Sequence, residues 1–314
     1  MPYVAVSGQK PPVLTEIAER RWAGILAARP DLAPAIALQR RLLTIVRELD
    51  AVLAGGKLPR LSLPPKYLAA KLGRGVPAFA AEPIPLPIPA MTPVLLQLCE
   101  ALATGGAGDA AAHIRESVAS GQMDAGSLFA ASLARNQNAI RSGAVHRGLA
   151  PDLVWLVGEL AVSPFVHRLQ QTLLAEAADA TLRAALAAWD HGYCAACGSW
   201  PALAEVVGGH RTLRCSFCSS AWELSRYACL YCGETGEKFV TAAPDEARKD
   251  RRVEVCSNCS GYLKTIDVPE LSPFPLLSLS DIESTDLDIA AMEHGYQRPA
   301  LKDFKAQGSR LNAH

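Results

Sequence analysis

Four pairs of cysteines, each with two residues between its members, stand out in this chain. Two intervening residues let both sulfurs of a tight turn reach one ion, and two such pairs supply the four thiolates of a tetrahedral metal site. A small residue, Gly or Ser, follows each second cysteine, where it tolerates the sharp turn. We therefore predict two metal sites whose ligands are Cys194, Cys197, Cys215, Cys218, Cys229, Cys232, Cys256 and Cys259.

Two predicted hairpins favour a sequential pairing of these motifs. Ala202–Val207 and His210–Arg214 flank Gly208-Gly209, which is typical of two strands joined by a tight turn. This hairpin would bring the first two cysteine pairs together. Glu237–Thr241 and Arg251–Val255 form a second plausible strand pair around a longer loop, and they would join the last two pairs. An interleaved pairing stays open.

The sequence leaves the identity of the metal open, because four thiolates suit Zn(II) and mononuclear iron equally. A disulfide framework conflicts with the reducing compartment predicted below, and a dithiol redox site needs a βαβ context that is missing. His191 and His210 lie near the motifs but are interpreted as ordinary surface histidines. The ninth cysteine, Cys99, lies in an apolar helical pattern and is interpreted as a buried small hydrophobe.

Helical patterns dominate the chain before the cysteine motifs. Apolar residues recur every three or four positions near 14–26 and 38–53, and further helices are predicted near 94–103, 109–120, 127–138 and from Pro151. A long helix is expected to open at Ser163-Pro164 and to reach Trp189. Nine prolines lie between Pro59 and Pro93, and within this stretch 82–90 alternates proline with apolar residues. That alternation predicts an extended, polyproline-like spacer, with a docking peptide as the alternative. The fold class predicted is α+β: an all-helical domain followed by two small metal modules.

Composition shifts divide the chain into four parts. We predict an all-helical domain over 1–188, a first metal module over 189–226 and a second over 227–268. A tail with a short helix near 282–296 occupies 269–314. The sequence leaves open whether that helix packs on a domain or on a partner, and whether the chain self-associates.

Charge and hydropathy exclude several classes of function. The chain has 31 basic and 31 acidic residues, and residues 190–260 hold eight Lys/Arg against nine Asp/Glu, so no phosphate-binding surface is predicted. The most apolar long window, Leu149–Val166, contains Asp152, Glu159 and Pro164, which argues against a membrane span. The first residues lack the pattern of a secretory signal. We expect a cytoplasmic protein that binds neither nucleic acid nor membrane.

The motifs resemble those of the bacterial formate dehydrogenase accessory protein family, FdhE. The resemblance lies in the segments 189–201, 209–218 with Trp222 and Arg226, 229–233, the last motif with Tyr262-Leu-Lys264, and 286–298. It implies a helical domain followed by two rubredoxin-like modules in which the eight cysteines bind iron. It also implies a cytoplasmic maturation factor that contacts the catalytic subunit of formate dehydrogenase. Ala195 stands where the family usually has proline.

The sequence is consistent with three functions. The leading hypothesis is a non-enzymatic accessory protein for formate dehydrogenase, because closed tetrathiolate sites leave no open position for substrate. The alternatives are a double-rubredoxin electron carrier and a zinc-ribbon structural or interaction protein. A partner surface or a cap on the small core is expected at Trp200, Pro201, Arg214, Trp222 and Arg226.

Overall fold

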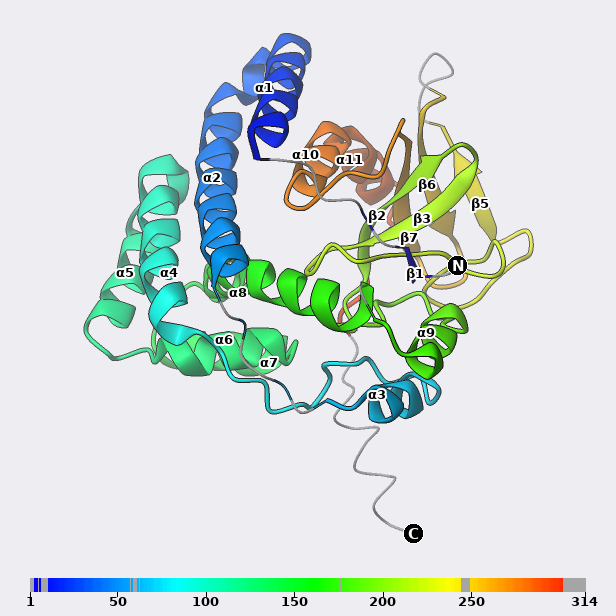
Figure 1. Cartoon of the computed structure of the whole chain (residues 1–314). Helices are drawn as coiled ribbons and strands as arrows, with labels where there is room; N and C mark the ends of the chain where they lie inside the picture. The colour runs from blue at the N-terminus through cyan, green and yellow to red at the C-terminus, as the bar shows by residue number, and fades with distance from the viewer. Residues whose placement is uncertain are drawn as a thin grey trace. The chain divides into compact units, whose positions relative to one another are not determined.

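The computed structural model describes residues 3–4, 6, 11–56, 58, 61, 63–175, 177–243 and 249–301. The chain divides into two compact units (Figure 1). Among the described residues, the sheet unit lies within Met1–Ala18, Leu63–Ala78 and Gln170–Lys302, and the helical unit lies within Glu19–Ser62 and Phe79–Leu169. Helix α1 (Pro11–Ala28) has residues in both. Residues 244–248 of the longer loop expected over 244–250, and the end of the tail, lie outside the described residues.

The helical unit is built from amphipathic helices, as the apolar spacing predicts. Its main elements are α2 (Ala33–Gly55), α4 (Ile88–Leu102), α5 (Gly108–Ala119), α6 (Ala125–Leu133), α7 (Gln137–His146) and most of α8 (Pro151–Gln170). Helix α4 packs on α2, α5 and α6. Cys99 is fully buried in α4, which confirms its interpretation as a core residue.

Two prolines expected to open helices lie inside them instead. Helix α4 begins at Ile88, so Pro93 is internal, and α8 runs through Pro164. An internal proline removes one backbone hydrogen bond. Tertiary packing offsets this loss in α8, because Val162, Phe165 and Val166 around the proline are fully buried. The predicted long helix to Trp189 is likewise wrong: α8 ends at Gln170, and a separate α9 spans Ala180–Ala187.

One stretch, Ile88–Ala119, is long and apolar enough to cross a membrane by length and composition alone. Its backbone leaves the helical conformation at Gly106, where φ is 123°, and again at Gly108, where φ is 47°. The two legs, α4 and α5, pack against each other (Figure 1). Each leg is therefore shorter than the about 20 residues that span a bilayer.

A seven-stranded sheet forms the centre of the sheet unit, with the order β1-β4-β3-β2-β7-β6-β5. The strands are β1 (Tyr3–Val4), β2 (Pro201–Val207), β3 (His210–Cys215), β4 (Ala221–Trp222), β5 (Phe239–Ala242), β6 (Arg251–Cys256) and β7 (Gly261–Asp267). Both predicted hairpins are present as β2–β3 and β5–β6. Gly208 and Gly209 both have positive φ, as a two-residue hairpin turn requires.

The sheet repeats one three-stranded motif. Each metal module contributes an antiparallel trio, β2-β3-β4 and β5-β6-β7, with its middle strand leading into a cysteine pair. The trios join where β2 lies parallel to β7, with Leu203 opposite Lys264. Strand β1 extends the edge beyond β4. The two modules thus share one continuous sheet.

The segment after β7 folds back onto this sheet. Helix α10 (Leu277–Glu283) buries Leu277 in a cluster with Leu203 and Ile266, and α11 (Thr285–Glu293) buries Ala291 among residues of β6 and β7. The tail helix therefore packs on its own domain. On another part of the unit, α3 (Pro65–Leu72) packs against α9.

Candidate metal centres

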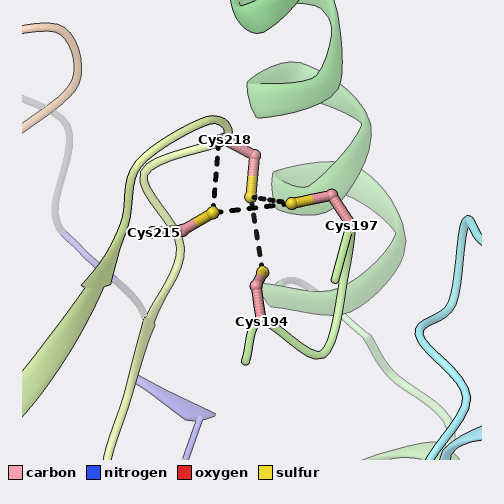
Figure 2. A group of neighbouring side chains, drawn as sticks. All are labelled: Cys194, Cys197, Cys215 and Cys218. Carbon is pink, nitrogen blue, oxygen red and sulfur yellow. Dashed lines mark hydrogen bonds between the residues drawn. The ribbon is translucent and has the colours of Figure 1, made fainter. Parts of the chain in front are cut away.

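The first cluster consists of Cys194, Cys197, Cys215 and Cys218, whose sulfurs all lie within 4.8 Å of one another. The Sγ–Sγ distance is 3.6 Å between Cys194 and Cys218, and 3.5 Å between Cys197 and Cys215. Figure 2 shows the four side chains converging from two loops. All four cysteines are buried. The first hairpin therefore brings its two cysteine pairs together as predicted.

The second cluster consists of Cys229, Cys232, Cys256 and Cys259, again with all sulfurs within 4.8 Å. The Sγ–Sγ distance is 3.7 Å between Cys229 and Cys259, and 3.6 Å between Cys232 and Cys256. The structure thus places all eight predicted ligands in two groups with the sequential pairing.

Backbone hydrogen bonds shape the turns that carry these cysteines. The Cys194 N–H donates to the Ser199 carbonyl at 2.9 Å, and the Gly198 N–H donates back to the Cys194 carbonyl at 2.9 Å. Cys229 and Gly233 repeat the second bond at 2.8 Å. The residues after the second cysteines, Gly198, Ser219, Gly233 and Ser260, all have φ between 54° and 81°. A small residue is favoured there because this left-handed backbone crowds a Cβ.

The spacing of the four cysteine sulfurs in each cluster fits tetrahedral coordination of one metal ion. Metal–sulfur bonds of about 2.3 Å would place tetrahedral sulfurs about 3.8 Å apart, close to the 3.5–3.7 Å distances in both clusters. Burial raises the pKa of the Cys215 and Cys218 thiols well above the ordinary value. A cation among the sulfurs would offset that cost, because a coordinated thiol loses its proton.

The thiols of the second cluster differ from one another in pKa. Burial raises the pKa of Cys229 far above the usual range and that of Cys259 to about 11. Partial burial also opposes ionisation of Cys232, but hydrogen bonds from the Asn258 side chain and the Glu234 backbone outweigh it and lower its pKa to about 7. Asn258 Nδ2 lies 3.6 Å from the Cys232 sulfur.

Two serines near the first cluster were not among the predicted site residues. The Ser220 hydroxyl lies 2.8 Å from the Cys218 sulfur, and the Ser199 hydroxyl lies 3.3 Å from the Cys197 sulfur. Each serine stands two positions after the second cysteine of its pair, a pattern the second module lacks. That spacing is the sequence signal for these contacts.

The neighbouring histidines and aromatic residues have structural roles. His191 stacks on Tyr193 with ring centroids 5.0 Å apart, His210 is exposed, and neither belongs to a metal-ligand group among the described residues. Trp200 and Trp222 are buried, and the Trp222 indole donates to the His191 carbonyl. These tryptophans cap the small core. Pro201 is also buried, whereas Arg226 is exposed.

Arg214 is fully buried beside the first cluster. Its guanidinium pairs with the equally buried Glu205 and donates to the Ser272 carbonyl at 2.6 Å. The Ser272 N–H donates to Glu205 Oε2 at 3.0 Å. Arg214 therefore ties the first module to the segment after β7 and is not available to a partner.

Comparisons with known proteins point to one family. A match to an FdhE homologue of Rhizobium meliloti (strain 1021) is 28% identical over 170 residues and covers 48% of this chain and 55% of that protein. A match to Escherichia coli FdhE (O127:H6, strain E2348/69) is 32% identical over 120 residues, covering 37% and 38%. A third, to an Aquifex aeolicus (strain VF5) homologue, is 30% identical over 113 residues, covering 34% and 40%. The aligned regions thus span about half or less of these relatives.

The fold is similar over nearly the whole chain. The crystal structure of the FdhE protein from Pseudomonas aeruginosa matches with a TM-score of 0.59 and 20% identity, covering 96% of this chain and 97% of that one. No family model matches the sequence. Together the relatives and the fold confirm the resemblance that the cysteine motifs indicated.

Proposed function

We propose that this chain, a relative of the FdhE proteins, is an accessory protein for formate dehydrogenase that carries two tetrathiolate metal sites. The observation that supports it most is the pair of four-cysteine clusters, set in one sheet within a fold similar to that of FdhE. The proposal includes a cytoplasmic location, where thiols remain reduced and free to bind metal.

Each site would use only cysteine sulfurs. Cys194, Cys197, Cys215 and Cys218 would hold one ion, and Cys229, Cys232, Cys256 and Cys259 the other. Iron bound in this way would supply one-electron redox chemistry, whereas zinc would supply only structural cross-linking. Iron is proposed from the resemblance, with zinc as the alternative. Four protein ligands close each site, which supports a binding role over catalysis.

The metal is tested by elemental analysis and visible spectroscopy of the full chain purified without oxygen. We expect about two iron ions per chain and a red, thiolate-to-Fe(III) absorption on oxidation. A colourless protein with two zinc ions would favour the zinc-ribbon alternative. A chain without bound metal would contradict the proposed sites.

The partner is tested by co-purification with the catalytic subunit of a formate dehydrogenase produced in the same cells. We expect the wild-type chain and a Cys99→Ala control to retain the subunit, because Cys99 lies in the helical core, outside both clusters. The Cys194→Ser/Cys197→Ser variant should lose it. Iron-loaded protein that retains no subunit but passes electrons between soluble redox partners would support the electron-carrier alternative.

A further inference from the structure

The two clusters differ sharply in their exposure to solvent. In the first cluster, Cys194, Cys215 and Cys218 are 0% exposed and Cys197 is 3% exposed. In the second cluster, Cys229 and Cys256 are buried, but Cys232 and Cys259 are exposed. The turns differ in the same direction. In the first cluster 193–200 are all buried and only Ser216 is exposed within 215–220, whereas in the second cluster 229–230 are buried but 232–233 and 257–260 are all exposed.

Two segments from distant parts of the chain cover the first cluster. Strand β1 pairs with β4, and the Tyr3 hydroxyl lies 3.3 Å from the Ser220 hydroxyl, which itself contacts the Cys218 sulfur. On the first turn, the Ala78 N–H donates to the Ala195 carbonyl at 2.8 Å. The Tyr193 hydroxyl donates to the Gly75 carbonyl at 2.8 Å. The turn with Cys194 and Cys197 is therefore held under residues 75–78, and the turn with Cys215 and Cys218 lies against Tyr3.

The described contacts of the second cluster come from near and distant residues, and they leave the side with Cys232 and Cys259 open. Asn258 contacts the Cys232 sulfur from its own turn, and the Gln297 N–H donates to the Ser260 carbonyl at 2.8 Å. A Cβ at Gly261 would stand 2.5 Å from the Tyr231 ring and 3.2 Å from the Cys259 sulfur, so these groups pack closely around this glycine. The Cys232 and Cys259 side of the cluster therefore faces solvent.

This asymmetry bears on ligand exchange. A bound ion leaves a tetrathiolate site when an incoming ligand bonds to it and displaces a thiolate, with no change in oxidation state. The incoming ligand needs access to the ion, so a buried site must first open locally. We propose that the second cluster exchanges its metal with soluble thiol or aminocarboxylate ligands while the first cluster retains its metal as a fixed structural site. This inference rests on the proposed metal binding.

The test uses the full chain loaded with zinc and challenged with the chromogenic chelator 4-(2-pyridylazo)resorcinol. The zinc content is measured first, and fewer than two ions per chain would contradict the proposed function itself. With two ions bound, we expect one equivalent to leave faster than the other by about tenfold or more, since only the slow one waits for local opening. Two equivalents leaving at one rate would overturn the inference while leaving metal binding intact.

The fast and slow phases of zinc release are each assigned to one cluster. N-ethylmaleimide is added during chelation, and the labelled cysteines are mapped by mass spectrometry. We expect label first on Cys232 and Cys259, then on the rest of the second cluster, and last on the first. Early label on Cys194 or Cys197 would overturn the assignment.

A conservative variant tests the contact by which residues 75–78 cover the first cluster. Tyr193→Phe removes the hydroxyl that donates to Gly75, so it should accelerate the slow phase and leave the fast phase unchanged. Tyr67→Phe is the matched control, because Tyr67 is an exposed tyrosine of α3. A slow phase that is the same in wild-type and Tyr193→Phe protein would contradict the role given to this cover.

Discussion

At the scale of single residues, the candidate metal sites are built from eight cysteines and the small residues that follow them. The left-handed φ values at Gly198, Ser219, Gly233 and Ser260 explain why larger residues would strain the turns. A second steric limit lies at Gly192, where a Cβ would stand 1.9 Å from the Leu230 carbonyl oxygen. Glycine there lets the first turn of one module pass close to that of the other.

The ligand assignment predicts a large loss from one pair of substitutions. Cys194→Ser/Cys197→Ser should halve the bound metal and lower the stability of the sheet unit by several kcal/mol, because binding energy at a structural site is folding energy. Metal analysis and urea unfolding measure both effects. Cys99→Ala should keep the full metal content. Unchanged metal in the double variant would refute the first site.

At the scale of elements, buried charge joins the last helices to the sheet. Lys264 on β7 is fully buried and pairs with Asp281 at 2.6 Å and with Asp288 at 2.7 Å. Asp288 also accepts from Arg298 at 2.9 Å and from the Tyr262 hydroxyl at 2.8 Å. A buried ammonium without partners is costly, so this network positions α10 and α11.

The network predicts a specific loss of stability in acid. Burial opposes ionisation of Asp288, but Lys264 and Arg298 outweigh it and hold its pKa below the usual value. A lowered folded-state pKa contributes stability above the unfolded value of about 3.9, and this is lost as the pH falls through the folded pKa. The advantage of the wild type over Asp288→Asn should therefore be largest near neutral pH and shrink below about pH 3.9.

Urea unfolding of both proteins between pH 3 and pH 7 measures this difference. Subtracting the two curves removes contributions that both share, including any release of metal in acid. Glu293→Gln, an exposed carboxyl change on the same helix, should show no comparable effect. A constant difference between wild type and Asp288→Asn across the range would show that ionised Asp288 does not contribute as inferred.

At the scale of the whole molecule, we expect the two units to differ in how far they depend on bound metal. The helical unit has an apolar core drawn from several helices, including the buried Leu95, Phe129 and Phe165. The apolar clusters of the sheet near the helices of the tail are small, four buried residues each. The sheet unit also carries both four-cysteine clusters, so we expect metal bound there to add to its stability.

Removal of metal should therefore affect the units unequally. Dialysis against a strong chelator should lower the melting temperature of the sheet unit and expose its strands to protease, while most helical circular dichroism persists. Limited proteolysis with mass spectrometry locates the cuts, which we expect within 189–268. Equal sensitivity of the helical unit to chelation would contradict this division.

The sequence alone was enough to predict the α+β class, the eight cysteines and their sequential grouping. These features are local: a two-residue spacing, a Gly-Gly turn between short strands and a repeating apolar face are each encoded within about 20 residues. The helices that cross Pro93 and Pro164 were misjudged because the local preference of proline was overridden by packing from elsewhere.

Only the tertiary structure decided how the modules join and how their clusters differ. The parallel pairing of β2 with β7 links residues about 60 positions apart, and the cover on the first cluster comes from residues 3 and 75–78. No local pattern encodes such contacts, since each depends on surfaces formed by folding. The two motif sets look alike in sequence, yet one became a buried site and the other an open one.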